Sequence, residues 1–340
     1  MFVDLIYCDT ISLVIKMTNK NILIIFTGGT ISMEKDANSQ AVNIRDNHDS
    51  LIQTLENQFK NIKLSSITFS MVPSPFMKID DLFTLAKLTF SKLKNEIDGV
   101  VITHGTDTLE ETAYFLDIFD SSSKPIVLTG SMRNYSEIGY DGLSNLASSI
   151  LVAASDDSKN RGVLVVLNDE INAASEVTKS HTLSLDTFKS LEFGPIGIID
   201  NQNVIYYRGI AQTKKVPQIS NLKGEVEIVK VSLGQSSLLL NLLIDHKISG
   251  IVLEALGRGN VPPQLVPSIE RALKENIPVV LTSRAPKGRV LDTYGYVGGG
   301  RHLKNIGVIF APNINSQKAR LKLLLLKSHT DDLDVIRRYF

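Results

Sequence analysis

Short apolar, β-branched runs alternate with longer helical patterns along this chain, and this alternation limits its possible folds more than any other feature. The first runs, which read as buried strands, are residues 21–27, 99–103, 125–129 and 163–167. Between them, at residues 81–94 and 109–119, apolar side chains recur three and four positions apart, which predicts helices. Strands and helices that alternate in this way form parallel sheets covered by helices. We therefore predict a doubly wound, mainly parallel α/β fold.

A polar stretch divides this pattern into two sets. Residues 201–221 are mostly polar and basic and contain Pro217 near their end, which is typical of a linker. Beyond it, the expected strands are residues 226–231, 250–253, 278–282 and 307–310, and the expected helices are residues 236–243, 266–275 and 317–327. We predict an extension at residues 1–20, a larger N-terminal α/β domain at 21–200, a linker at 201–221, and a smaller parallel-sheet α/β domain at 222–340.

The amino-acid composition excludes several classes of protein and several kinds of site. Lys plus Arg and Asp plus Glu both number 36, so the formal net charge is zero, whereas nucleic-acid-binding proteins usually carry a basic excess. An apolar fraction of 43% excludes disordered and collagen-like chains. The single cysteine, Cys8, excludes an intrachain disulfide, and the six histidines lack the spacing of a metal site. The chain is therefore expected to act on a small molecule, with no nucleic-acid partner and no metal.

Residues 1–16 form an apolar stretch without the features of a targeting segment. Asp4 and Asp9 interrupt the apolar run, no early Lys or Arg precedes it, and it is too short to span a bilayer. Met17 follows directly and precedes the first strong strand. We expect translation to start at Met17, the extension to be disordered, and the protein to be cytoplasmic with no membrane partner.

Turns that contain Thr and Gly follow the first two predicted strands. They read TGGT at residues 27–30 and THGTDT at residues 103–108. In a doubly wound sheet, ligands bind at the carboxyl ends of the strands. TGGT lacks the glycine spacing of dinucleotide folds and the lysine of a phosphate-binding loop, so a tight turn without a function is the alternative. In a functional site, this turn would present the Thr30 hydroxyl at the strand end.

The second turn is more informative, because it holds more polar residues than a helix start requires. Thr108 and Glu111 have the spacing of a capping box, which predicts a helix N-terminus here. Free N–H groups at such a terminus suit a carboxylate or a developing oxyanion. The cap does not account for Thr106 and Asp107, which precede it. A hydroxyl beside a carboxylate at a strand end is a candidate functional pair.

Taken together, these motifs resemble a known family. TGGTIS at residues 27–32 and THGTDTLEETAYFLD at residues 103–117 are similar to the two signatures of bacterial-type L-asparaginases. The similarity continues through PIVLTGSMR, DGLSNL, RGVLVVLNDEI, VTKSHT, EALGRGNVP and QKARLKLLL, and it covers residues 20–340. VPSPFM at residues 72–77 resembles the cytoplasmic, type I-like branch.

The resemblance implies the two-domain asparaginase fold, with the catalytic site in the N-terminal domain, and hydrolysis of L-asparagine to L-aspartate and ammonia. Thr30 matches the nucleophile that forms an acyl-enzyme, and Thr106, Asp107 and Lys179 match the family's catalytic triad. A lysine accepts a proton only when it is neutral, which desolvation favours and a neighbouring carboxylate opposes; the sequence leaves this balance open. Because water hydrolyses the ester, no cofactor is expected.

The same resemblance assigns the substrate contacts. Ser74 matches the residue that binds the α-carboxylate of the substrate, and Asp107 also anchors its α-amino group. The substrate-binding set is completed by Gly29, Pro75 through its main chain, Gly105 and Thr106. Family members are homodimers or homotetramers in which a neighbour's second domain completes the site. Asn260, on the GRGN loop, matches the asparagine contributed across that interface.

Two departures from the family pattern concern activation of the nucleophile and binding of the substrate. The family's mobile loop normally carries a tyrosine that polarises the nucleophile, but the polar segment at residues 32–49 has none. That segment is predicted to be either a mobile loop over the site or a plain surface loop. A water, Lys179, Tyr294 or Tyr296 remain as activating groups. Where the secreted branch has an acidic or amide residue after its substrate serine, this chain has Pro75 followed by Phe76, and Phe76 is predicted to be a packing residue.

Two other functions remain as alternatives. One is the asparaginase-like subunit of a tRNA-dependent amidotransferase, although that family carries an additional domain before its TGGT motif and zero net charge offers no tRNA face. The other is an asparagine sensor that binds through Ser74 and Asp107 but turns over poorly, which the missing loop tyrosine suggests. The full set of Thr30, Thr106, Asp107 and Lys179 favours the enzyme.

Overall fold

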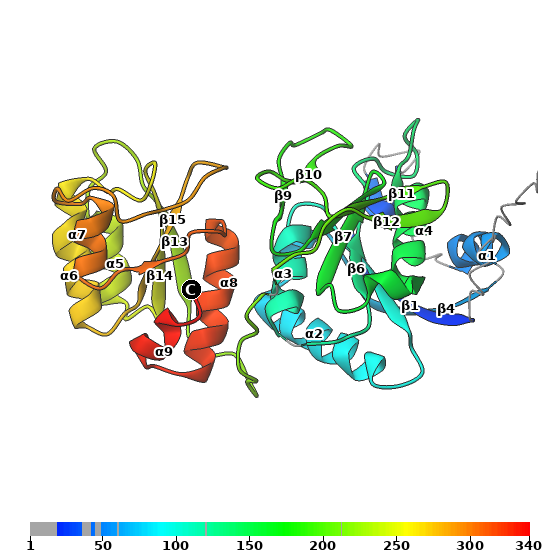
Figure 1. Ribbon diagram of the computed structural model, residues 1–340, viewed down its shortest axis with the longest axis horizontal. Helices are drawn as coiled ribbons and strands as arrows, with labels where there is room; N and C mark the ends of the chain where they lie inside the picture. The colour runs from blue at the N-terminus through cyan, green and yellow to red at the C-terminus, as the bar shows by residue number, and fades with distance from the viewer. Residues whose placement is uncertain (1–18, 36–41, 45–48, 60, 120, 212) are drawn as a thin grey trace, which may run out of the picture.

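Two α/β domains lie side by side in the computed structural model (Figure 1). The described residues are 19–35, 42–44, 49–59, 61–119, 121–211 and 213–340. The predictions for residues 1–16, for Cys8 and for a start at Met17 lie outside them. In the described part of the chain, no helix is long and apolar enough to cross a membrane.

The N-terminal domain is built on an eight-stranded sheet in the order β12-β11-β8-β7-β6-β5-β1-β4. Its parallel strands are β1 (Lys20–Gly28), β4 (Ile62–Val72), β5 (Gly99–Thr103), β6 (Ile126–Thr129) and β7 (Val163–Leu167). An antiparallel edge follows, formed by β8 (Glu170–Ala173), β11 (Gly197–Asp200) and β12 (Asn203–Tyr206). The predicted mainly parallel α/β fold is confirmed.

Helices cover both faces of this sheet. One face carries α1 (Asp49–Gln58) and α4 (Gly142–Ala154), and the other carries α2 (Ile79–Leu93) and α3 (Leu109–Phe119). Central strands such as β5 are buried at every residue because both faces are covered, which is why they read as continuous apolar runs.

The predicted linker begins one strand too early. β12 lies within residues 201–221, where it pairs with β11 at the edge of the sheet. Its side chains alternate between exposed and half-buried, so an edge strand of this kind is polar enough to resemble a linker. The sheet of the N-terminal domain therefore extends past residue 200.

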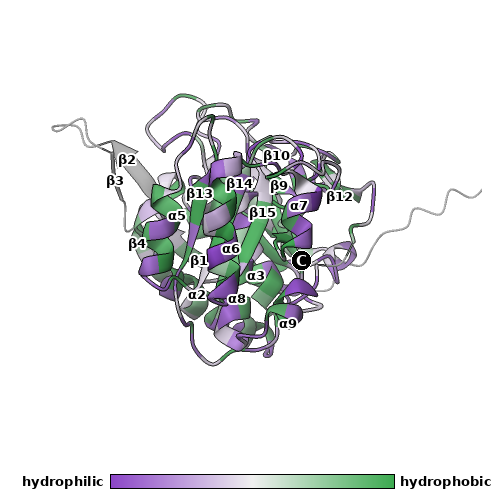
Figure 2. Ribbon diagram, turned by 90° about the vertical axis from the view of Figure 1, so that its left-hand side faces the viewer, coloured by the Kyte–Doolittle hydropathy of each residue, from purple (hydrophilic) through white to green (hydrophobic). Residues whose placement is uncertain are grey.

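The C-terminal domain has a four-stranded, fully parallel sheet made of β13 (Val226–Lys230), β14 (Gly250–Ala255), β15 (Val279–Ser283) and β16 (Ile309–Phe310). Its helices are α5 (Leu238–Asp245), α6 (Val266–Lys274), α7 (Gly300–Asn305), α8 (Ser316–His329) and α9 (Leu333–Arg337). Apolar strands lie behind helices of mixed polarity (Figure 2). Figure 1 shows α8 between this sheet and α3 of the other domain.

One hydrophobic cluster runs through both domains. It includes buried residues of α2 and α3 together with residues of α8 and the C-terminal sheet, for example Phe115 and Leu323, both fully buried. Burial of this continuous apolar surface fixes the two domains against each other.

Two short hairpins project from the main sheets. The first, β2 (Met33–Lys35) paired with β3 (Val42–Ile44), follows the 3₁₀ turn η1 (Thr30–Ser32). This hairpin lies within residues 32–49, which were predicted to be a loop without regular structure. Most of the other residues of that segment lie outside the described chain. The second pairs β9 (Val177–Lys179) with β10 (Phe188–Ser190). Further 3₁₀ turns are η2 (Ser74–Phe76), η3 (Asp156–Ser158) and η4 (Pro263–Leu265).

Candidate active site

Three neighbouring strands, β4, β1 and β5, end at the same edge of the sheet. η2 follows β4 and places Ser74 there, whereas η1 follows β1 and begins with Thr30. The turn after β5 carries Gly105, Thr106 and Asp107. Residues that lie far apart in the sequence thus converge at the carboxyl ends of parallel strands, where such sheets bind ligands.

Glycines bring these three segments into direct contact. Gly29 has a positive φ of 82°, and a Cβ atom built on it would lie 2.4 Å from the Gly105 nitrogen. A Cβ atom on Gly105 would lie 2.7 Å from the Ser74 Oγ atom. No side chain fits at either position, so both glycines are required for this close approach. Thr30 and Thr106 each follow one of these glycines, which places both threonines at this edge.

Lys179 joins the site from the end of β9. Its Nζ atom lies 3.0 Å from Thr106 Oγ1 and 2.8 Å from Asp107 Oδ1. The lysine side chain is 16% exposed, whereas that of Asp107 is 64% exposed and can meet a ligand. We call Thr106, Asp107 and Lys179 the lysine cluster. Such a cluster can move a proton between a hydroxyl and an amine and can bind a cationic group at the carboxylate.

The helix after the second motif begins at Leu109, as predicted. The Thr108 hydroxyl, which the capping-box pattern assigned to the helix terminus, donates to the Ser74 carbonyl oxygen at 3.2 Å. It therefore ties the start of α3 to η2.

Tyr140 supports the segment that carries Thr30, and sequence patterns did not identify it. Its hydroxyl donates to the carbonyl oxygen of Ile31, the residue after Thr30, at 2.9 Å. Burial and the nearby Asp141 raise the pKa of the Tyr140 phenol, so it stays protonated and remains a donor. No motif or periodicity marks this tyrosine, because it lies 109 residues from its partner.

Removing the Tyr140 hydroxyl is expected to loosen η1 and lower turnover. Tyr140→Phe should reduce kcat about 10-fold, because small displacements of a reacting group are costly. The matched control is Tyr206→Phe. Tyr206 is half-buried on β12, the edge strand farthest from β4 in the sheet, and its hydroxyl lies 2.7 Å from the Ser158 hydroxyl. Equal kcat values for the two variants would contradict a role for Tyr140 at the site.

The His104 side chain hydrogen-bonds the backbone of Gly105, the residue that follows it in the turn. Its Nδ1 atom lies 2.8 Å from the Gly105 carbonyl oxygen, and its Nε2 atom lies 2.9 Å from Thr112 Oγ1. A carbonyl oxygen only accepts, so Nδ1 carries the proton and Nε2 accepts from the threonine hydroxyl. The ring is fully buried, and this burial lowers the pKa of His104 to about 4. The imidazole is therefore neutral near neutral pH.

This histidine should make stability depend on pH. Below pH 6.5 the unfolded chain protonates the ring, whereas the folded protein does so only near pH 4. The free energy of unfolding therefore decreases as the pH is lowered from 6.5 to about 4. The loss from this group is about 3 kcal/mol. In urea titrations at several pH values, His104→Gln should show a shallower decline. His246→Gln, at an exposed position, should keep the wild-type slope.

The remaining residues that the sequence singled out lie on the protein surface or in the C-terminal domain. Pro75 is exposed, and Phe76 is 71% exposed, so the prediction that Phe76 is a packing residue within the chain is wrong. Its place on η2, at the surface beside Ser74, explains this exposure. Tyr294 and Tyr296 stack on each other in the C-terminal domain, with ring centroids 5.6 Å apart. Asn260 is in that domain too, and its buried Oδ1 atom accepts no hydrogen bond from a described residue.

Metal ligands are not grouped at this site. Among the residues that the structure describes, no cluster of three or more His, Cys, Asp or Glu side chains could hold a metal ion.

Comparison with known proteins identifies the family. Residues 21–212 match the family model described as "Asparaginase, N-terminal", and residues 225–340 match the "Glutaminase/Asparaginase C-terminal domain". A Bacillus licheniformis protein named L-asparaginase is 35% identical over 91% of this chain and 95% of its own length. A Haemophilus influenzae protein named probable L-asparaginase periplasmic is 36% identical, over 94% of this chain and 92% of its own.

A solved structure shares the whole architecture. The crystal structure of a probable cytoplasmic L-asparaginase from Campylobacter jejuni superposes with a TM-score of 0.84 at 32% identity. The alignment covers 94% of this chain and 98% of that one. Matches to both domain models, together with similarity along nearly the full length, show that this chain belongs to the asparaginase family.

Proposed function

We propose that this protein hydrolyses the side-chain amide of L-asparagine to L-aspartate and ammonia. The observation that carries the proposal is the lysine cluster, in which Lys179 contacts both Thr106 and Asp107 beside the paired glycine turns. Relatives named L-asparaginases along nearly the whole chain support the same activity and do not favour an amidotransferase subunit or a sensor.

Thr30 is the proposed nucleophile. Its hydroxyl oxygen attacks the amide carbon, and its proton passes to a base, for which Lys179 is the candidate, acting through Thr106. The proton then goes to the departing nitrogen, and ammonia leaves an ester on Thr30. A water molecule attacks this ester, releases aspartate and restores the threonine hydroxyl. A hydroxyl needs such a neighbouring base because it is a weak nucleophile at neutral pH.

The substrate's charged ends have matching partners. The exposed Asp107 carboxylate suits the α-ammonium group, and Ser74 suits the α-carboxylate. Gly29 and Gly105 let the turns after β1 and β5 pack closely against each other and against Ser74, which holds these substrate-binding groups together. A zwitterionic amino acid needs only such local groups, which agrees with a net charge of zero.

We further propose that the active form is a cytoplasmic homodimer or homotetramer, in which Asn260 of one subunit faces the site of another. The match of Asn260, on the GRGN loop, to the asparagine that the family contributes across its interface supports this. Light scattering should detect an oligomer at assay concentrations. A fully active monomer would rule the proposal out.

Ammonia release from L-asparagine, L-glutamine and D-asparagine tests the activity directly. L-asparagine should be hydrolysed by the purified protein alone. Release that requires a second protein would instead indicate an amidotransferase subunit. Tight binding of L-asparagine without turnover would indicate a sensor.

A further inference from the structure

The first turn of α8, in the C-terminal domain, contacts both elements that carry the lysine cluster. Gln317 Nε2 donates to Glu110 Oε1 at 2.7 Å, at the start of α3 and three residues after Asp107. Lys318 Nζ donates to the carbonyl oxygen of Val177 at 2.5 Å, two residues before Lys179 on β9. One helical turn thus touches the segments on both sides of the contacts that Lys179 makes.

Lys318 occupies a helix position at which a buried lysine is unfavourable. A cation in the first turn of a helix opposes the helix dipole, and Lys318 is only 2% exposed. Burial lowers the pKa of Lys318 to about 8, against the attraction of four acids, of which Glu110 acts most strongly. A residue that violates local preference and keeps a buried charge is expected where the tertiary structure needs it.

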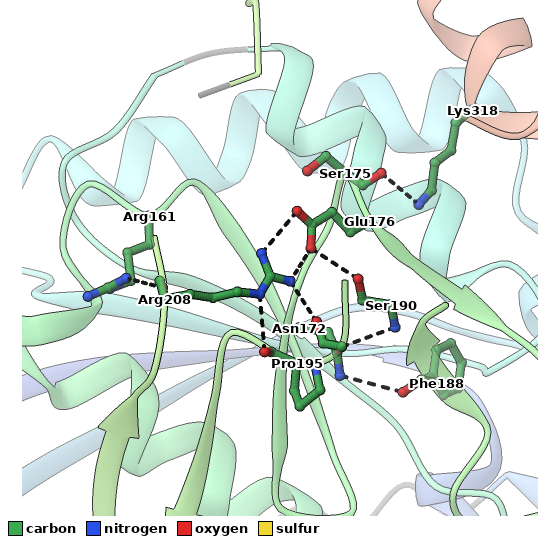
Figure 3. Close-up of polar contacts among 10 residues, drawn as sticks. Arg161, Asn172, Ser175, Glu176, Phe188, Ser190, Pro195, Arg208 and Lys318 are labelled. Atoms are coloured by element: carbon green, nitrogen blue, oxygen red, sulfur yellow. Dashed lines mark hydrogen bonds and ion pairs between the residues drawn. The ribbon is translucent and has the colours of Figure 1, made fainter. Parts of the chain in front are cut away.

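Lys318 supports a stretch that is also held from its other side (Figure 3). Its Nζ atom lies 3.4 Å from the carbonyl oxygen of Ser175. Between these two carbonyls, the Glu176 carboxylate accepts from Arg208 Nη2 at 2.5 Å and from Ser190 Oγ at 3.0 Å. Both the backbone and the side chain of the segment before Lys179 are therefore fixed by charged donors.

A cavity adjoins part of this stretch. Its volume is about 970 Å³, and its wall includes Ser175, Glu176 and Lys318 along with residues of both domains. Lys318 lies in the wall of this cavity and bonds the stretch there from the C-terminal domain, whereas Val177 is itself fully buried in the core.

We propose that the first turn of α8 positions the lysine cluster, with Lys318 fixing the strand that bears Lys179 and Gln317 fixing the helix that follows Asp107. Both act through other residues and touch no substrate. The C-terminal domain thereby sets the distance between Lys179 and Thr106 within the same chain. This inference rests on the proposed amide hydrolysis.

Lys318→Met, which keeps the length of the side chain but removes the donor, is expected to lower kcat for L-asparagine about 10–100-fold with KM changed less than about threefold. The matched control is Lys322→Met. Lys322 lies one turn further along α8, is also buried, and has its Nζ atom 4.9 Å from the Phe340 ring centroid, away from the lysine cluster. It should lose little kcat at a comparable change in thermal stability.

A double-mutant cycle separates positioning from general destabilisation. In a Lys179→Met background, Lys318→Met should change the residual kcat less than about twofold, because the lysine it positions is gone. Independent, additive losses would overturn the proposal, as would equal kcat values for Lys318→Met and Lys322→Met. If Lys318→Met does not fold, Gln317→Ala at its half-buried site takes its place in the cycle, and additivity with Lys179→Met again overturns the proposal. A wild-type protein inactive on every amide would instead refute the proposed function.

Discussion

Thr30→Ala is expected to lower kcat for L-asparagine by roughly 10⁴–10⁶-fold, the scale seen when an enzyme loses its nucleophile. Without the hydroxyl, no ester can form, and the lysine cluster has no oxygen to activate. Ser74 and Asp107 remain in place, so substrate binding should persist. Ammonia release measures the rate, and calorimetric titration with L-asparagine measures the binding.

Thr30→Ser provides the control for this experiment. It retains the hydroxyl and removes only a methyl group, so it should keep far more activity than the alanine variant. If Thr30→Ala hydrolyses L-asparagine within 10-fold of the wild-type rate, Thr30 is not the nucleophile.

Lys179→Met is expected to reduce kcat by about 10²–10⁴-fold, the range for loss of a general acid or base. The change removes the Nζ atom that lies 3.0 Å from Thr106 Oγ1 and 2.8 Å from Asp107 Oδ1. Methionine preserves the length of the side chain, so β9 should keep its place. Steady-state ammonia release across a range of pH gives the comparison.

Lys189→Met tests whether the effect belongs to this lysine or to the hairpin. Lys189 lies on β10, the partner strand, and pairs with Glu170 at 2.8 Å and with Asp186, away from the lysine cluster. Its substitution should change kcat less than about threefold. A comparable loss in both variants would mean that hairpin stability, not proton transfer, sets the rate.

Periodicity made the central architecture predictable. β5 and β7 were predicted at the residues where they occur, because strands covered on both faces must be apolar throughout. Less regular elements escaped prediction. β4 has only two fully buried residues, near its start, and its exposed and half-buried positions include serines and a lysine; β12 was included in the linker. Edge strands meet solvent, so their composition approaches that of loops.

The family resemblance supplied the candidate site residues, and their roles stay predictions. The resemblance grouped Gly29, Ser74 and Gly105 as one substrate-binding set, and in the structure Gly105 lies directly against both Gly29 and Ser74. The exposure of Phe76 was not predicted, because burial of a side chain in a turn depends on which distant segments pack against it.

By itself, the sequence determined the α/β class, the two sheets, and the strand ends at which Thr30, Thr106 and Asp107 lie, whereas Lys179 was assigned to the site only through the family resemblance. These follow from short-range patterns, since hydrophobic period and turn chemistry act over a few residues. Only the tertiary structure decided which groups support the site: Tyr140 bonds Ile31 across 109 residues, and Lys318 bonds Val177 across 141. Such contacts depend on which polar groups become buried together once both domains have packed, and no local pattern records that.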